Sequence, residues 1–298
     1  MYEELVKQFG RRACRDEPMS RHTSFRIGGP ADLLVDVENR DELRDVLRYA
    51  QDGGLALHVI GRGANVLVRD AGIRGVVVRL AGEFRNVSWE EAAGRAKPGG
   101  GALLSTLVAE SSRRGFGNFC WAAGIPGTIG GAVTSNAGAW GHSTGEFVEA
   151  LGVMTHDGRE VTLVKGQVTF GYRQTLLAVQ GIITDVALRL ERTPGGEDDP
   201  RRSSAEYLAR KRETQPLEVP SAGSVFKNPP QGAAGELIDR AGCKGMQQGG
   251  AAVSAKHANF IVNNGGATAT DVLKLIERVV ERVKTRFGVE LELEIRVL

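Results

Sequence analysis

Two glycine-rich stretches are the residues of this chain best suited to binding a ligand through the backbone. The first glycine loop, Gly61–Asn65 (GRGAN), follows a predicted strand, and the second, Gly124–Gly131 (GIPGTIGG), continues to Asn136-Ala137-Gly138. Glycine lets the backbone approach a ligand closely, and Pro126 fixes φ within the second loop. Bare N–H groups in such turns can bind a phosphate. Together the two stretches predict loops that hold one cofactor.

Neither loop matches a common nucleotide-binding motif. The first lacks the third glycine and the following helix of the dinucleotide fingerprint, because Val66-Leu67-Val68 are β-like. Neither loop carries the lysine-serine pair of a Walker A sequence. Taken alone, the first loop is also explained as an ordinary tight turn, and only the presence of the second favours a cofactor.

Three further segments carry side chains suited to acid–base or carboxylate chemistry. Arg173 in Tyr172-Arg173 could bind a carboxylate with two parallel hydrogen bonds, although a surface arginine is the simpler explanation of the dipeptide alone. Ser224 in the SAGSVFKNP segment could donate a proton, or the segment could be a turn into a strand. His257 and Asn259 at a strand entry are expected to form a structural hydrogen-bonding pair rather than a catalytic one.

The elements that must position these segments begin as in an α/β protein. A strand at 31–37 is followed by a helix capped by Asn39, and a strand at 57–60 leads into the first glycine loop. The final segment, Glu290–Ile295, alternates glutamate with apolar residues and predicts a strand with one solvated face, in which nothing singles out Glu294. The other expected elements are strands at 75–80 and 182–190, a hairpin at 153–164, and helices at 102–114, 203–214 and 270–286.

Composition excludes several classes of protein. The 298 residues include 38 Lys+Arg and 36 Asp+Glu, and this balance does not favour nucleic acid as a partner. Three cysteines without CxxC spacing argue against a disulfide framework, and no histidine spacing suggests a metal site, so we expect no metal. The absence of a long apolar segment predicts a soluble, cytoplasmic protein without a membrane span. We expect it to be a monomer.

Six segments, taken in order, resemble the UDP-N-acetylenolpyruvoylglucosamine reductase family. The resemblance covers the chain from about residue 20 to its C-terminus, and six ordered segments are far more specific than any one of them. They are HTSFRIGG at 22–29, the two glycine loops, YR at 172–173, AGSVFKNP at 222–229 and VSAKHANF at 253–260.

The resemblance implies an α+β fold with two FAD-binding subdomains of the vanillyl-alcohol-oxidase type and a C-terminal α+β substrate domain. We expect the subdomains at 1–80 and 81–194, and the substrate domain at 195–298. The resemblance also implies a flavoenzyme of peptidoglycan precursor synthesis. In this family NADPH reduces FAD, which passes hydride to the enolpyruvyl group of a UDP-sugar to give UDP-N-acetylmuramate.

The resemblance assigns roles to individual residues. Arg173 would hold the substrate carboxylate, Ser224 would protonate the neighbouring carbon, and a protonated Glu294 would stabilise the developing charge. The UDP-sugar would contact Tyr172, Arg210, Lys211, Lys227 and Asn228. FAD would contact Gly61, Arg62, Gly63, Ala64, Asn65, Val66, Gly124, Ile125, Pro126, Gly127, Thr128, Gly130, Gly131, Asn136, Ala137 and Gly138.

Some positions depart from the family pattern. Trp140 and Gln174 replace a common tyrosine and serine, and Phe119-Cys120-Trp121 stands where Gly-Leu-Glu is frequent. The chain is also too short for the tyrosine-bearing loop of the longer subclass, so it resembles the shorter one. Two other functions remain open: a flavin oxidase, although no residue for covalent flavin attachment is obvious, and a nucleotide-binding module without catalysis.

Overall fold

The computed structural model describes residues 2–193 and 199–298. The chain divides into two structural units, and each unit is built from separate stretches of the sequence. Unit 1 comprises Met1–Arg15, Leu33–Gly61 and Gly75–Arg210, and unit 2 comprises Asp16–Asp32, Arg62–Arg74 and Lys211–Leu298. The division into domains at 1–80, 81–194 and 195–298 stays a prediction. Its boundary between residues 194 and 195 lies outside the described residues.

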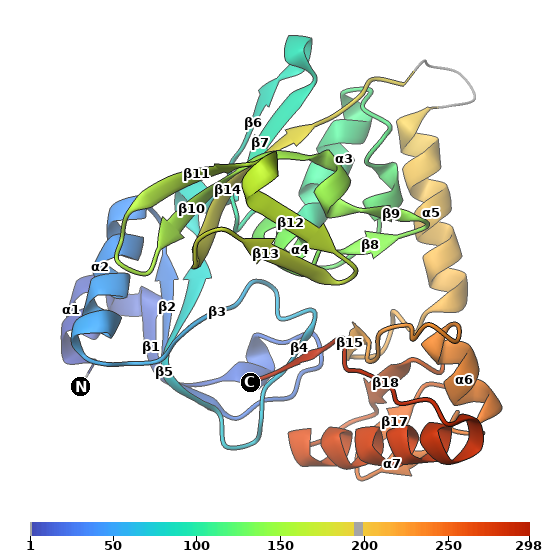
Figure 1. Cartoon of the computed structure of the whole chain (residues 1–298). Coiled ribbons are helices and arrows are strands. Elements are labelled where there is room, and N and C mark those ends of the chain that lie inside the picture. Colours follow the sequence, from blue (N-terminus) through green and yellow to red (C-terminus); the bar gives the residue numbers. More distant parts are fainter. Residues whose placement is uncertain (1, 194–198) are drawn as a thin grey trace. The chain divides into compact units, whose positions relative to one another are not determined.

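The first sheet of unit 1 carries the strand that leads into the first glycine loop. Its strand order is β1-β2-β5-β3, and β3 runs parallel to β5. Helix α2 forms as predicted, since Asn39 caps it by accepting a hydrogen bond from Glu42 N at 2.9 Å. Its buried apolar stripe packs against this sheet (Figure 1). The bounds are α1 Glu3–Phe9, β1 Ala13–Pro18, β2 Pro30–Val37, α2 Arg40–Asp52, β3 Leu57–Val59 and β5 Ile73–Leu80.

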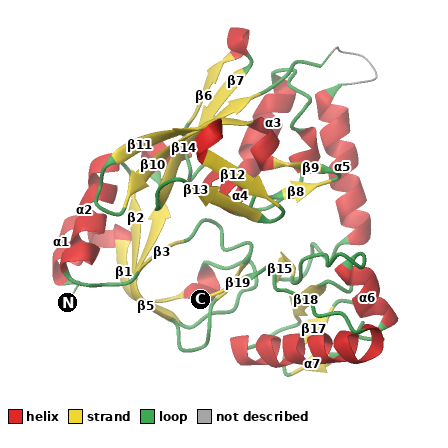
Figure 2. Ribbon diagram, in the orientation of Figure 1, coloured by secondary structure: helices red, strands yellow, loops and turns green. Residues whose placement is uncertain are grey.

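The second sheet of unit 1 has the strand order β11-β10-β14-β7-β6, and Figure 2 shows helices α3 and α4 beside it. The hairpin of β10 and β11 turns at Asp157-Gly158, as predicted. The bounds are β6 Val87–Glu90, β7 Arg95–Pro98, α3 Leu104–Arg113, α4 Ile129–Thr134, β8 Gly138–Ala139, β9 His142–Ser143, β10 Val148–Thr155, β11 Glu160–Val164, β12 Val168–Gly171, β13 Gln174–Leu177, β14 Gly181–Arg189 and α5 Pro200–Thr214. Strands β8–β9 and β12–β13 form two separate hairpins.

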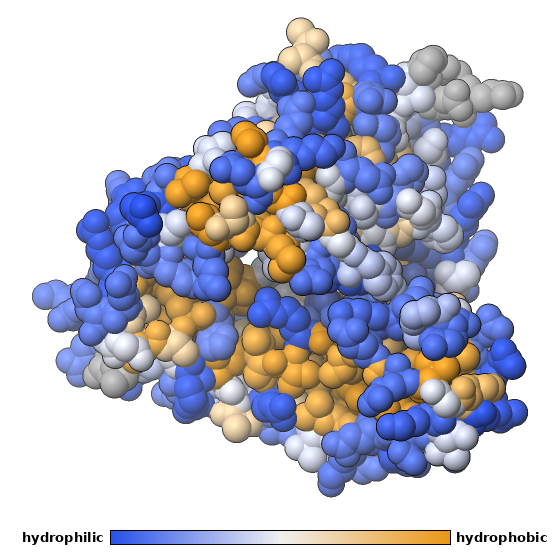
Figure 3. Space-filling model, viewed as in Figure 1, coloured by the Kyte–Doolittle hydropathy of each residue, from blue (hydrophilic) through white to orange (hydrophobic). Residues whose placement is uncertain are grey.

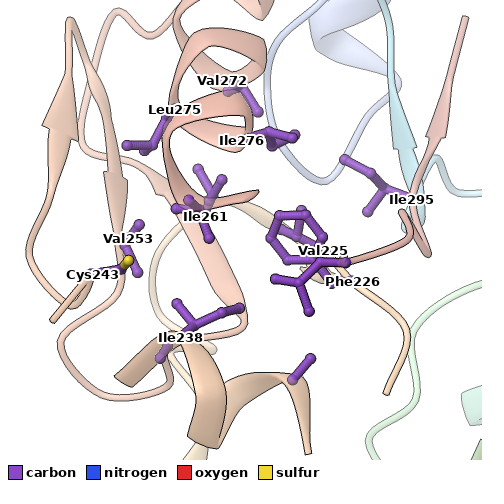
Figure 4. Close-up of a cluster of buried hydrophobic side chains, with 14 of the residues drawn as sticks. Val225, Phe226, Ile238, Cys243, Val253, Ile261, Val272, Leu275, Ile276 and Ile295 are labelled. Carbon is purple, nitrogen blue, oxygen red and sulfur yellow. The ribbon is translucent and has the colours of Figure 1, made fainter. Parts of the chain in front are cut away.

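Unit 2 is built around a sheet of order β15-β18-β17-β16 and a parallel pair, β4 with β19. Its core combines Phe25 and Leu67 with residues from 222 to 295. Figure 4 shows Val225, Phe226 and Ile295 within this core. The bounds are β4 Val66–Leu67, β15 Ser221–Ser224, α6 Ala234–Arg240, β16 Gln247–Gln248, β17 Ala251–Val253, β18 Phe260–Asn263, α7 Ala269–Phe287 and β19 Arg296–Val297.

Short 3-10 helices join several of these elements. They are η1 Gly10–Arg12, η2 Met19–Arg21, η3 Gly82–Arg85, η4 Glu91–Ala93, η5 Cys120–Ala122, η6 Thr144–Phe147 and η7 Lys165–Gln167. Among the described residues, no helix combines the length and the apolar character needed to cross a bilayer.

The predicted strand at 290–295 is wrong in its bounds. The regular strand is β19, at Arg296–Val297, and residues 292–295 bond irregularly to the segment after β15. Both Glu294 N and Ile295 N approach the same acceptor, Val225 O, at 2.8 and 3.5 Å, so a regular ladder cannot form here. The alternation in the sequence therefore reflects burial of Leu291 and Ile295 rather than a continuous strand.

The β12–β13 hairpin exposes large apolar side chains. Tyr172 and Leu176 are each 55% exposed, and Val164 at the end of β11 is 54% exposed. Figure 3 shows apolar residues gathered over this part of unit 1. The turn that holds Arg173 therefore lies on an exposed and partly apolar surface.

Candidate active site

The first glycine loop presents free backbone donors. Among the described residues, none accepts a hydrogen bond from the backbone N–H groups of Gly61 to Asn65. Gly63 has φ 60°, and a Cβ there would lie 2.2 Å from His22 O, so only glycine fits. Successive unpartnered N–H groups form an anion-binding turn. The loop therefore fits the diphosphate of a dinucleotide such as FAD.

The two glycine loops meet within unit 1 at Gly61. A Cβ at this residue would lie 2.4 Å from Thr128 Oγ1, and Thr128 caps α4 by accepting a hydrogen bond from Gly131 N at 3.4 Å. The remaining residues of the first loop, together with Val66, belong to unit 2. The predicted residues from Gly124 to Gly138 all belong to unit 1. Gly61, at the start of the first glycine loop, therefore lies against Thr128 of the second loop, the residue that caps α4.

A third glycine segment, which was not predicted as part of the site, supports the second loop. Gly130 N donates to Gly100 O at 2.8 Å, and Ile129 N donates to Ala102 O at 2.9 Å. These bonds occupy N–H groups at the start of α4 and hold the loop against residues 99–102. The run Gly99-Gly100-Gly101 was the signal in the sequence that could have identified this support.

Asn136 fixes the segment after α4 with both ends of its carboxamide. Its Nδ2 donates to Gly171 O at 2.8 Å, and its Oδ1 accepts from Gly145 N at 2.9 Å. The residue is buried and has φ 41°, which asparagine tolerates better than most residues. Its side chain therefore ties Ala137 and Gly138 to the β12–β13 turn.

Arg173 lies at that turn, between Gly171 and Gln174, which pair across the hairpin. Its Nη1 donates to Gly138 O at 3.0 Å, and its guanidinium carbon lies 5.5 Å from the centre of the Tyr172 ring. Arg173 also has φ 55°, an uncommon conformation for a residue other than glycine. The backbone conformation and the bond to Gly138 O therefore help to set the direction of the guanidinium.

Ser224 and Glu294 are brought onto neighbouring segments in unit 2. Ser224 ends β15 and pairs with Phe260 of β18. On the opposite edge, Glu294 N donates to Val225 O at 2.8 Å, and Phe226 pairs with Leu293. Within the described chain, no residue forms a hydrogen bond with the Ser224 hydroxyl. The hydroxyl is therefore available to a substrate.

Asn259 clamps the segment that follows Ser224, a role that the sequence did not reveal. Its Oδ1 accepts from Phe226 N at 2.9 Å and its Nδ2 donates to Phe226 O at 2.8 Å. Asn259 N in turn donates to His257 Nδ1 at 3.2 Å. The pKa of His257 is lowered, first by burial and then by the charge of Lys244. His257 and Asn259 therefore have the predicted structural relationship, with a neutral imidazole.

The residues expected to contact the UDP-sugar are spread over both units. The Lys227 ammonium pairs with the Glu292 carboxylate. Asn228 Oδ1 accepts from Ala234 N at the start of α6 at 3.0 Å. Arg210 and Lys211 lie in α5, on either side of the point where the two units divide. Tyr172 is exposed beside Arg173.

Comparison with known proteins supplies the family. Residues 31–163 match the model of an FAD binding domain, and residues 215–298 match that of the UDP-N-acetylenolpyruvoylglucosamine reductase C-terminal domain. UDP-N-acetylenolpyruvoylglucosamine reductase 2 of Symbiobacterium thermophilum is 46% identical over 96% of this chain and 92% of its own length. The reductase of Moorella thermoacetica is also 46% identical, over 95% of this chain and 92% of its own.

A solved structure agrees with these matches. The crystal structure of UDP-N-acetylenolpyruvylglucosamine reductase from Thermus caldophilus is 39% identical, covers 94% of this chain and 97% of its own, and has a TM-score of 0.81. The predicted fold class, an FAD-binding fold followed by a further α+β domain, is confirmed by the two domain matches and this neighbour. The chain belongs to the UDP-N-acetylenolpyruvoylglucosamine reductase family of FAD-dependent oxidoreductases of peptidoglycan precursor synthesis.

Proposed function

We propose that the protein uses NADPH and FAD to reduce the enolpyruvyl group of UDP-N-acetylglucosamine enolpyruvate, giving UDP-N-acetylmuramate. Family membership and the FAD binding domain support the reaction class. The observation that carries the chemistry is the placement of Ser224 and Glu294 on adjacent segments, which are joined by the hydrogen bond from Glu294 N to Val225 O.

FAD, when bound and reduced by NADPH, supplies the hydride. Its addition to the outer vinyl carbon leaves an electron pair on the carbon that bears the carboxylate, and the charge spreads onto the carboxylate oxygens. The Ser224 hydroxyl donates its proton to that carbon, which completes the new C–H bond, and the serine regains a proton from solvent. Ser224 is the last residue of β15, and its backbone position is fixed by pairing with Phe260 of β18.

Arg173 and Glu294 stabilise the charge on the carboxylate. The guanidinium offers paired donors that suit carboxylate geometry, and its bond to Gly138 O holds it in place before the substrate arrives. Glu294, in its protonated form, donates a further hydrogen bond. Removal of one such preorganised donor costs about 10²–10³ in rate in other enzymes.

The remaining predicted residues bind rather than react. The backbone N–H groups of the first glycine loop and the backbone of the second would hold FAD. Tyr172, Arg210, Lys211, Lys227 and Asn228 contact the UDP-sugar. Because Lys227 already pairs with Glu292, substrate phosphate would replace a carboxylate as its partner.

The two half-reactions test this proposal separately. The purified protein should be yellow, lose its flavin absorbance with NADPH, and regain it on addition of the enolpyruvyl UDP-sugar. Ser224→Ala should leave reduction by NADPH intact and slow reoxidation by the substrate by about 10²-fold or more. Ser221→Ala, on the same strand, is the matched control and should change neither rate.

Two outcomes would contradict the proposal. Equal loss of both half-reactions in Ser224→Ala would remove the proton-donor role of this serine. Rapid reoxidation by air, without any response to the UDP-sugar, would favour an oxidase.

A further inference from the structure

Asn65 links the first glycine loop to the segment that carries Glu294. Its Nδ2 donates to Glu294 O at 3.1 Å, across 229 residues of sequence. Its own carbonyl oxygen accepts from Arg296 N at 3.0 Å. From there, β4 and β19 continue side by side, with Val66 opposite Arg296. One residue of the loop therefore holds the chain on both sides of Ile295.

Glu294 is held from its other edge by the Ser224 segment. Glu294 N donates to Val225 O, whereas Glu294 O receives the Asn65 amide. The main chain of Glu294 thus lies between the residue after Ser224 and the last residue of the first glycine loop. Displacement of Asn65 would release the carbonyl of Glu294, so that the main chain of this residue would be held only through its N–H bond to Val225 O and could turn about that bond.

The loop that carries Asn65 is only partly fixed by the protein. Ser24 N donates to Gly63 O at 3.1 Å, which anchors the middle of the loop. The backbone N–H groups from Arg62 to Asn65 donate to no residue in the described part of the chain. An anion that satisfies these donors would add the missing constraint at the point where Asn65 leaves the loop.

We propose that Asn65 is a positioning residue that couples cofactor binding at the first glycine loop to the placement of Glu294 beside the Ser224 segment. The inference rests on the proposed function for the role of Glu294, whereas the coupling itself depends only on FAD. Coupling of this kind is reciprocal, so a change at Asn65 should alter both cofactor binding and the order of residues 290–298.

Hydrogen exchange measured by mass spectrometry tests the coupling without turnover. In the unmodified protein, FAD should slow exchange in peptides that cover 290–298 by about two- to tenfold, the range for one hydrogen bond. In Asn65→Ala at saturating FAD, this slowing should be lost. Asn264→Ala is the matched control, because Asn264 is exposed and its side chain has no hydrogen bond within the described residues. It should retain the slowing.

A double-mutant cycle tests whether Asn65 acts through Glu294. At saturating FAD, Asn65→Ala should slow reoxidation by the UDP-sugar by up to about tenfold, and should slow it more than it slows flavin reduction by NADPH. In a Glu294→Gln background, Asn65→Ala should add no further loss, because the group that it positions is already altered.

The possible failures can be told apart. If the UDP-sugar does not reoxidise the flavin of the unmodified protein, the proposed function fails, and the exchange experiment still decides the coupling. If FAD leaves exchange at 290–298 unchanged in the unmodified protein, the coupling is wrong. Full FAD-dependent slowing in Asn65→Ala, or additive losses in the cycle, would also overturn it. If Asn65→Ala does not fold, the apo and FAD-loaded unmodified proteins still provide the test.

Discussion

Replacement of Asn259 by alanine should loosen the segment that positions Ser224. Asn259 is 4% exposed, and its carboxamide is the hydrogen-bond partner of both Phe226 N and Phe226 O. Asn259→Ala leaves these two backbone groups without a partner at a residue that is only 2% exposed. Each buried unsatisfied group costs about 1–3 kcal/mol, so the free energy of unfolding of unit 2 should fall by about 2–6 kcal/mol.

Hydrogen exchange is the appropriate assay for this variant. The three tryptophans, Trp89, Trp121 and Trp140, all belong to unit 1, so their fluorescence does not report directly on unit 2. Since 1.4 kcal/mol corresponds to a factor of ten, a loss of 2 kcal/mol should speed exchange in peptides from 221–228 by about 30-fold. Asn264→Ala should leave the exchange of these peptides unchanged.

Two results would refute the reasoning. One is a folded Asn259→Ala protein whose 221–228 peptides exchange at the unmodified rate. The other is equal acceleration in Asn264→Ala, which would show that loss of any asparagine in this region has the same effect. The clamp should also matter for chemistry, so reoxidation by substrate should slow more than reduction by NADPH.

Two further predictions concern the cofactor loops and pH. Gly61→Ala should weaken FAD binding about tenfold or more in a flavin titration, because its Cβ would lie 2.4 Å from Thr128 Oγ1; Gly166→Ala, which meets open space, should not. The pKa of His257 is lower in the folded protein than the ordinary 6.5 of the unfolded chain. As the pH falls below 6.5, the unfolded chain binds a proton at His257 before the folded protein does, so the free energy of unfolding declines in this pH range. His257→Gln should flatten the pH dependence of the urea midpoint, and an unchanged slope would contradict this.

Elements whose signals are local could be predicted from the sequence. Helix α2 has its cap at Asn39 and its apolar stripe within a single segment, and α7 begins at a Thr268 cap and ends at Gly288. The last strand was predicted at the wrong residues, because residues 292–295 bond irregularly to the segment that follows β15. Alternation at 290–295 records which side chains are buried, whereas hydrogen bonding depends on Val225, which no local pattern reveals.

The candidate site was predicted by resemblance more than by pattern. Nothing in the spacing of glutamates singled out Glu294, and the tyrosine-arginine dipeptide alone did not distinguish Arg173 from a surface residue. The supporting contacts of Asn65 and Asn259 join segments far apart in the sequence, so a local reading could not find them. The triple glycine at 99–101 is a local signal, but nothing in its spacing connects it to the second glycine loop.

Unit 2 can fold only late in synthesis, because its core joins segments that are far apart in the sequence. Asn263 bonds to Phe25 O across 238 residues, and β4, near residue 66, finds its partner only in β19. Residues up to 297 must therefore leave the ribosome before this core can close, and until then Phe25 and Leu67 lack their native neighbours. Nascent chains of this protein should depend on chaperones that shield early apolar segments, and loss of residues 296–298 should be far more damaging than their small number suggests.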